Sequence, residues 1–335
     1  MIEPGAEALS YEALFEQDGL RVSRSPWGPD DEIGRLNWMT PESCADVLSR
    51  LDGSRIFDLA VEYFIGMPSW IVAGDPKYDI WMTHTPTGTV NDDLTGAGSD
   101  IHRAYSYAGS AVTMYTHVGT HMCSLNHVGH HGRFWNGWTA DTHLGSRAWR
   151  VGGVFPPIVA RAVLLDVATA KGVECLEDSY AITAADLVGA ADAADVAPRR
   201  GDIVLVRTGR MTRWPDQAGF LDAPPGLGMD AARFLCESIG AMCVGVDAGG
   251  EALPPERRDS FLPVHAYLLA TAGTPIIENM WLEDVARERL FEFALMAFPL
   301  KLAGSTGVPV RAVGMAFRRD VTPQPQPSVT SGDAI

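Results

Sequence analysis

The residues best suited to chemistry are concentrated in one short segment of the chain. Five of its nine histidines lie between positions 117 and 131, and His117 and His121 are four residues apart, with Cys123 two residues further on. The preceding residues 112–116 are strand-like and a glycine follows, which predicts a strand that leads into a tight loop. Imidazole and thiolate are ligands that zinc prefers, so the three side chains are candidate metal ligands. Packing of the same side chains in the core is the alternative.

A second candidate group lies far downstream. His265 begins a predicted helix that ends near Gly273, and an extended segment then leads to Glu278. Glu278 directly follows two isoleucines, and a carboxylate buried beside apolar residues needs a partner. A metal ion is one such partner. A surface loop for Glu278, and a helix cap or a core position for His265, are the alternatives.

Short runs rich in Val, Leu and Ile predict the buried strands that must position these groups, with helical patterns between them. The predicted strands cover residues 56–63, 162–167, 202–207, 241–246, 291–298 and 308–317. The predicted helices cover residues 40–50, 183–191, 230–239, 265–273 and 282–289. This mixture indicates an α/β or α+β domain. No G-x-G-x-x-G motif follows a strand, so we do not expect a dinucleotide-binding fold.

The charge of the chain limits its classes of partner. Among the 335 residues, 42 are acidic and 26 are basic, which gives a formal net charge of -16. Phosphate contacts need Lys and Arg, so we expect no nucleic-acid partner. Docking on an anionic membrane surface is disfavoured for the same reason, and no run reaches the roughly 18 to 20 apolar residues of a membrane span.

The cysteines and the N-terminal sequence indicate a compartment. The five cysteines are odd in number and widely scattered, which is not the pattern of a disulfide framework. The N-terminal sequence lacks the basic stretch and apolar run of a secretory signal. We therefore expect a cytoplasmic protein with reduced thiols.

Aromatic side chains are candidates for a substrate pocket. Trp27, Phe64, Trp70 and Trp81 lie in segments that the sequence predicts to be rich in loops. Such side chains favour a small aromatic or otherwise flat apolar molecule. A subunit interface, where Trp is also enriched, is the alternative, and both hold if the N-terminal arm reaches a neighbouring subunit.

The histidine segment resembles the signature of a known family. The sequence from His117 to His127 is similar to H-x-G-T-H-x-D-x-P-x-H, the motif of the cyclase family of metal-dependent hydrolases, which includes bacterial kynurenine formamidase and isatin hydrolase. Further stretches that resemble the family are residues 27–37, 201–209, 246–247, 273–279 and 299–311. They indicate one domain over residues 1–320, with an N-terminal arm of about 50 residues. Residues 321–335, rich in Pro and Gln, are expected to form a disordered tail.

The resemblance implies a fold, an assembly and a set of roles. It implies a swivelling β/β/α domain, with a mixed β core or flattened barrel flanked by helices, and a homodimer or homotetramer. His117 and His121 would hold one divalent ion, and His265 and Glu278 a second. The last histidine of the motif, His127, would transfer protons.

The chain departs from the family motif at the position that bridges the two ions. Cys123 stands where the motif has Asp, and Leu125 where it has Pro. A carboxylate bridge suits manganese or magnesium, whereas a thiolate suits zinc. A zinc site with a thiolate ligand, a single ion, and no catalytic metal are the open outcomes. Because the other four ligand positions are retained, we expect a divalent metal, zinc in preference to manganese, as one or two ions.

The expected activity follows from the resemblance. It is hydrolysis of an amide, cyclic imide or lactone C–N or C–O bond in a small aromatic molecule by metal-activated water, with His127 as acid and base. One alternative is a metal-free cyclase or lyase, in which Cys123 could act as a nucleophile with His127 as its base. A member of the family that only binds a ligand is the other.

Overall fold

The computed structural model describes residues 11–70, 74–253 and 261–318. The predicted tail, residues 321–335, and the first ten residues of the predicted N-terminal arm lie outside this range. Among the described residues, no helix has the length and apolar character needed to cross a membrane.

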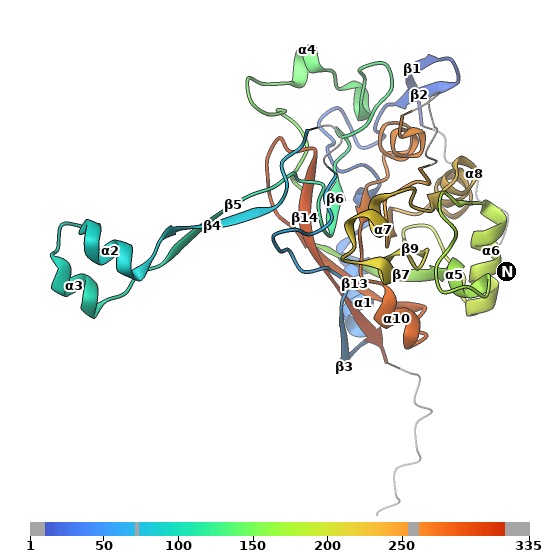
Figure 1. Ribbon diagram of the computed structural model, residues 1–335. Coiled ribbons are helices and arrows are strands. Elements are labelled where there is room, and N and C mark those ends of the chain that lie inside the picture. The colour runs from blue at the N-terminus through green and yellow to red at the C-terminus, as the bar shows by residue number, and fades with distance from the viewer. Residues whose placement is uncertain (1–10, 71–73, 254–260, 319–335) are drawn as a thin grey trace, which may run out of the picture.

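The centre of the molecule is a closed barrel of seven strands (Figure 1). Their order around the ring is β13 (Glu292–Pro299), β7 (Ile158–Asp166), β9 (Ile203–Arg207), β11 (Cys243–Val246), β12 (Ile276–Glu278), β6 (His121–Cys123) and β14 (Gly307–Phe317). β14 pairs with β13 and closes the ring. The strands from β7 to β12 run parallel and the other pairs are antiparallel. An eighth strand, β3 (Leu51–Asp58), pairs with β14 outside the ring. The mixed barrel confirms the predicted fold.

Successive side chains along each barrel strand face two different hydrophobic layers. On β7, Leu164 belongs to the layer inside the barrel and Leu165 to the layer between barrel and helices. On β12, Ile277 faces inward and Ile276 outward in the same way. The strands are therefore buried on both faces, which is why their sequences are continuous apolar runs.

The predicted helices are present. They are α1 (Pro41–Ser49), α6 (Ala184–Ala194), α8 (Met229–Arg233) continued by the π-helix η4 (Phe234–Ile239), α9 (Pro263–Ala266) continued by the π-helix η5 (Tyr267–Thr271), and α10 (Glu283–Arg287). Thr40 and Thr183 each accept a hydrogen bond from the third residue of the following helix in a capping box.

Short elements complete the chain. They are the hairpin of β1 (Ala13–Gln17) and β2 (Leu20–Ser23), the pair β8 (Ala181–Ile182) and β10 (Gly226–Leu227), the helices α4 (Ala140–His143), α5 (Val167–Ala170) and α7 (Gln217–Leu221), and the 3-10 turns η1 (Gly34–Trp38), η2 (Trp135–Gly137) and η3 (Arg210–Arg213).

The strand predicted over residues 56–63 ends earlier, at Asp58 of β3. The Asp58 carboxylate accepts a hydrogen bond from the backbone of Ala60 (3.2 Å), which turns the chain. The backbone of Val61 then donates to the Thr120 hydroxyl (2.9 Å) instead of to a strand. The segment leaves the sheet and supports the loop that follows His117.

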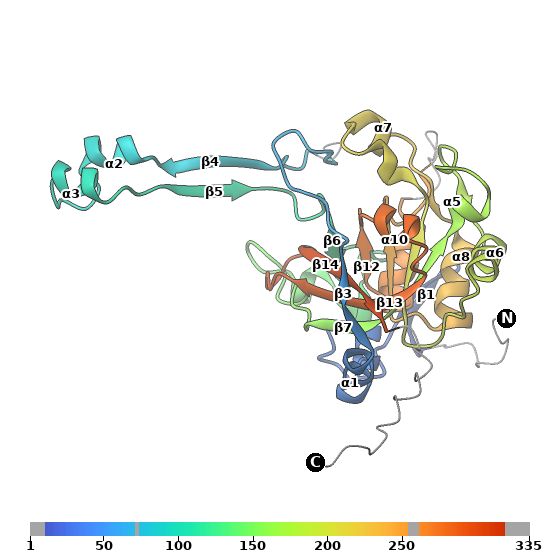
Figure 2. The same cartoon turned by 90° about the horizontal axis from the view of Figure 1, so that it is seen from below.

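Residues 79–113, which we call the arm and which are distinct from the N-terminal arm, extend far from the barrel (Figures 1 and 2). β4 (Asp79–His84) and β5 (Gly109–Thr113) form a two-stranded ribbon, and α2 (Pro86–Asp92) and α3 (Ser99–Ala104) lie at its far end. The strand predicted over residues 112–116 overlaps β5 only at residues 112–113, because β5 already ends at Thr113. Its partner strand and the two short helices were not predicted.

A buried arginine fastens the N-terminal segment to the body. Arg35 is 1% exposed, and its guanidinium donates to the carbonyl oxygens of Cys236 (2.8 Å) and Ala272 (2.9 Å). These carbonyls lie within η4 and at the end of η5. Arg35 thereby satisfies the final turns of two helices, one of which continues the helix of His265.

We expect Arg35→Met to lower the free energy of unfolding by about 3 kcal/mol, because it leaves buried carbonyl groups without a donor. The control is Arg24→Met, since Arg24 is about half exposed and pairs with exposed Glu12; its effect should stay within about 0.5 kcal/mol. Denaturant unfolding of both variants makes the comparison. Equal stability of the two would show that Arg35 does not hold the segment.

Candidate metal centre

The register of the short strand β6 brings candidate ligands together. In the antiparallel pair with β12, His121 lies directly opposite Glu278, and Cys123 lies opposite Ile276. Residues two apart on a strand share a face, as do directly opposed residues. His121, Cys123 and Glu278 therefore project on the face of Ile276, outside the barrel interior.

His117 reaches the same place from the loop before β6. Its ring lies against Gly307 of β14, where a Cβ atom would come within 2.5 Å of the imidazole. Gly119 has a φ of +56°, a conformation that favours glycine, and a Cβ there would lie 2.7 Å from the Tyr63 ring. Both glycines are needed for the close approach of this loop to its surroundings.

The four side chains converge as a set of metal donors. One ligand atom from each of His117, His121, Cys123 and Glu278 lies within 4.8 Å of all the others, and all four residues are buried. Cys123 Sγ is 3.4 Å from His117 Nδ1 and 3.3 Å from Glu278 Oε2. Donors of one tetrahedral zinc ion, at bond lengths of about 2.0 to 2.3 Å, lie roughly 3.3 to 3.8 Å apart. The two Cys123 distances match this spacing, and imidazole, thiolate and carboxylate are all ligands of zinc.

The hydrogen bonds of His121 supply a test of this fit. Its Nδ1 lies 2.9 Å from the carbonyl oxygen of Gly119, which only accepts, so Nδ1 carries the proton. Its Nε2 is buried and, within the described part of the chain, has no partner in hydrogen-bonding geometry. Glu278 Oε2 lies 3.0 Å from that nitrogen. A cation between this nitrogen and the carboxylate oxygen, either a proton or a metal ion, would satisfy both atoms in the buried site.

Charges around the cluster keep Glu278 ionised. Burial raises the pKa of this carboxyl group, but His265 and His121 hold it well below its usual range. Burial lowers the pKa of His121, but Cys123 and Glu278 raise it to about 10. The cluster is thus strongly attractive to positive charge, whether carried by a proton or by a metal ion.

His265 contacts the cluster from α9 and is held there by a carboxylate that the sequence did not indicate. Its Nε2 lies 3.2 Å from Glu278 Oε1, while Nδ1 and the backbone nitrogen each lie 3.0 Å from Glu251 Oε2. Glu251 is 1% exposed and fixes the ring orientation. His265 and Glu278, which were predicted to act together, are therefore in contact. Glu278 also lies among the donors of the motif of residues 117–127.

His127 lies beside the donors without belonging to them. Its ring stacks on that of His117 with centroids 3.7 Å apart, and lies 6.2 Å from that of His265. Burial, together with the charge of His265, lowers the pKa of His127 to about 3. The imidazole is therefore neutral near pH 7.

The four predicted substrate-binding aromatics are not brought together. Trp27 packs edge-on against Tyr11 and Trp38 and lines a surface cavity of about 640 Å³ that includes none of the four donors. Phe64 packs on Trp214, Trp70 is half-buried, and Trp81 lies on the arm. Tyr115 does lie beside a predicted ligand, with its ring centroid 4.9 Å from that of His117.

Comparisons with known proteins support the fold and identify a family. The family model Cyclase, described as "Putative cyclase", matches residues 57–250, a range that includes His117, His121, Cys123 and His127. No curated protein sequence matches the chain.

Solved structures share the fold over most of their length. A crystal structure of a novel cyclase is 26% identical with a TM-score of 0.72, and the match covers 86% of this chain and 97% of that one. Isatin hydrolase A from Labrenzia aggregata, bound to benzyl benzoate, is 19% identical with a TM-score of 0.58, covering 79% and 94%. A predicted metal-dependent hydrolase from Bacillus stearothermophilus is 22% identical with a TM-score of 0.50, covering 78% and 98%.

The family match includes more than half of the 335 residues. It contains the motif of residues 117–127, which supplies three of the four donors, His117, His121 and Cys123. The chain therefore belongs to the Cyclase family.

Proposed function

We propose that this protein is a metal-dependent hydrolase that binds a divalent ion, preferentially zinc, through His117, His121, Cys123 and Glu278. The observation that carries the proposal is the convergence of these four buried donors, together with a His121 Nε2 that has no partner in hydrogen-bonding geometry among the described residues. Solved relatives that are named as isatin hydrolases and as a metal-dependent hydrolase support the reaction class. A thiolate among the ligands favours zinc over manganese.

The chain's own residues supply positioning and proton transfer. A divalent ion at this site would polarise an acyl carbonyl group and lower the pKa of a water molecule. His127, neutral and stacked on His117, accepts a proton from the attacking water and returns it to the leaving nitrogen or oxygen. Thr306, whose hydroxyl lies 3.0 Å from His117 Nε2, holds that ring in place. His265 and Glu251 orient Glu278 from the other side.

The substrate that we propose is a small amide, cyclic imide or lactone with an aromatic or flat apolar body. Tyr115 lies against His117 at the donor cluster and supplies one apolar wall.

The five cysteines are free thiols, which supports a cytoplasmic location.

A second candidate uses the thiol of Cys123 in place of a metal ion. Cys123 Sγ lies 3.4 Å from His117 Nδ1, which is close to the contact expected between a nucleophile and its base. In this alternative, His117 takes the place that the sequence suggested for His127.

His117→Ala and His127→Ala separate metal binding from proton transfer. We expect His117→Ala to lose metal and activity together, because it removes one of four protein ligands. His127→Ala should retain the metal and lower turnover by about two to four orders of magnitude, the usual contribution of one acid–base group. Elemental analysis and hydrolysis rates of aryl formamides, cyclic imides and lactones are measured on the same preparations.

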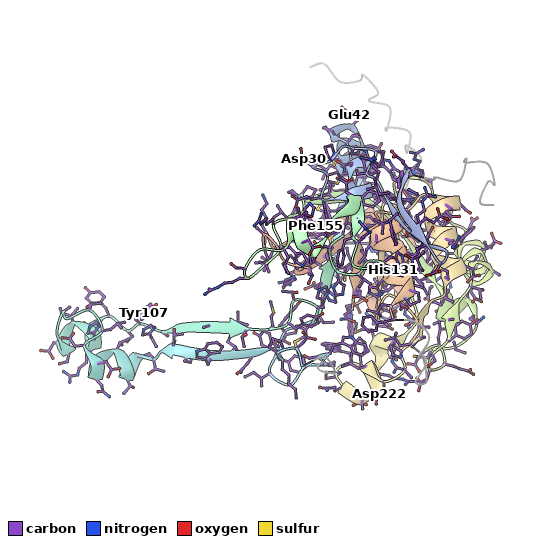
Figure 3. The ribbon with its side chains drawn as sticks, turned by 90° about the horizontal axis from the view of Figure 1, so that it is seen from above. Asp30, Glu42, Tyr107, His131, Phe155 and Asp222 are labelled. Carbon is purple, nitrogen blue, oxygen red and sulfur yellow. The ribbon has the colours of Figure 1, made fainter. Side chains whose placement is uncertain are left out.

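The matched control for these variants is His131→Ala. His131 (labelled in Figure 3) belongs to the same histidine segment but is exposed, with its ring 5.5 Å from that of Phe15. Metal content and rate should not change. Loss of metal from His127→Ala would make His127 a ligand. Wild-type protein that contains no zinc, manganese or iron, and gains no activity on reconstitution, would contradict the proposal.

Cys123→Asp distinguishes a ligand from a nucleophile. If Cys123 is a ligand, the carboxylate should preserve metal binding and activity and shift the preference from zinc toward manganese. If it is the nucleophile, the same change should abolish turnover in a folded protein. Competition between the two metals, together with steady-state rates, reads out the difference. An active Asp variant would eliminate the nucleophile mechanism.

A further inference from the structure

A cavity of about 280 Å³ lies between the hairpin of β1 and β2 and the helix that carries His265. The hairpin packs on η5, the continuation of that helix (orange in Figure 1), and the Thr271 hydroxyl donates to the carbonyl oxygen of Arg21. Of the described residues that line the cavity, none is one of the four candidate metal donors. The cavity is therefore separate from the candidate metal centre.

The guanidinium group of Arg21 is an uncompensated positive charge in the wall of this cavity. Arg21 is half-buried and its Nε atom is shielded from solvent, yet within the described parts of the chain the side chain has no hydrogen bond or ion pair. Glu16 lies directly opposite Arg21 in the hairpin, but it is exposed and does not pair with it. A charged group that is partly removed from water without a partner is unfavourable, so an anion in the cavity would be stabilised beside Arg21.

His130 adds a second unsatisfied group to the same cavity. It is only 6% exposed and lines the cavity, and its backbone pairs with that of Arg133. Its ring has no hydrogen-bond partner among the residues that the structure describes. Burial, together with the charge of His131, lowers the pKa of His130, so the ring is neutral near pH 7 and has one N–H group to donate.

The other charges that line the cavity are already compensated or exposed. Glu237 accepts a hydrogen bond from the Tyr267 hydroxyl (2.8 Å) and lies 4.0 Å from Arg233. The Arg233 guanidinium in turn lies over the Tyr267 ring, 5.5 Å from its centroid. Glu16 is exposed to water. The groups that still lack a partner are thus both hydrogen-bond donors, Arg21 and His130, and they call for an acceptor with a negative charge.

The remaining walls of the cavity are apolar and set the size of its occupant. They are formed by one aromatic ring and three aliphatic side chains, those of Tyr267, Leu20, Met229 and Pro263. Pockets for drug-sized molecules take roughly 300 to 1,000 Å³, so a cavity of about 280 Å³ suits a molecule with a single ring. An aromatic ring would pack well against the ring of Tyr267.

We propose that this cavity is a binding site for a small aromatic carboxylate. Its carboxylate group accepts hydrogen bonds from the guanidinium of Arg21, whose parallel N–H groups match two carboxylate oxygens, and from the ring of His130. Its ring lies against Tyr267. A single negative charge fits better than the double charge of a phosphate ester, because Glu16 and Glu237 also line the cavity and repel further negative charge. The proposal does not depend on a metal ion or on hydrolysis at the donor cluster.

Calorimetric titration of the full chain with benzoate tests the proposal. We expect Arg21→Gln to weaken binding by about 10- to 100-fold, the usual effect of losing a hydrogen bond to a charged group. His130→Phe, which keeps an aromatic ring but removes the donor, should weaken it by about 10-fold. The matched control is Arg24→Gln, because Arg24 lies in the same hairpin but pairs with Glu12 and does not line the cavity. Its affinity should equal that of the wild type, and circular dichroism checks that all variants are folded.

Two further titrations establish what is recognised and where. Benzamide has the shape of benzoate without its charge and should bind at least about 10-fold more weakly. His117→Ala disrupts the donor cluster and should leave the affinity for benzoate unchanged. Benzoate binding that persists in Arg21→Gln and disappears in His117→Ala would place the ligand at the donor cluster and overturn the proposal. Equal affinity for benzamide, or no binding of benzoate to the wild type, would also overturn it. None of these measurements requires turnover, so they stand whether or not the protein proves to be a hydrolase.

Discussion

The antiparallel register of β6 between β12 and β14 is the constraint on which the candidate centre depends. It sets Glu278 opposite His121 and Gly307 opposite Cys123, although these residues are far apart in the sequence. Closure of the barrel fixes all three strands, since β14 also pairs with β13. A shift of one residue would turn His121 and Cys123 toward the barrel interior and bring Met122 to the donor face. The donor cluster is thus a property of the barrel rather than of the histidine segment alone.

Polar contacts around the barrel hold the donors in their orientations. The Gly119 carbonyl oxygen lies 2.9 Å from His121 Nδ1 and accepts a hydrogen bond from the Asn279 amide at 3.0 Å, which joins the first loop to the end of β12. Thr306 holds His117, and Glu251 holds His265. His117 and His121 each have a supporting contact outside the donor set, and His265, which contacts Glu278, is held by Glu251.

Local patterns predicted most of the barrel strands, because apolar runs record burial on both faces. The same reasoning found His117, His121, Cys123, His265 and Glu278 as candidates. It did not place Glu278 beside His121, since strand pairing is non-local. Glu251 has no recognisable spacing to another ligand and becomes visible only when α9 packs beside its loop. The sequence did not predict the fold of residues 79–113. Their ribbon has no buried face that would give a periodic apolar pattern, and α2 and α3 have only seven and six residues. The four substrate aromatics stay predictions.

The π-helix η5 bears on how relatives should be aligned. A π turn holds one more residue than the α-helical turn it replaces, while the flanking residues keep their places on the helix. η5 lies between His265 on α9 and Glu278 on β12. A homologue with a regular α-helix here would have one residue fewer between the two, with both side chains in the same positions. A single-residue gap at this point in an alignment is therefore compatible with an unchanged site, and a rigid spacing rule would miss such proteins.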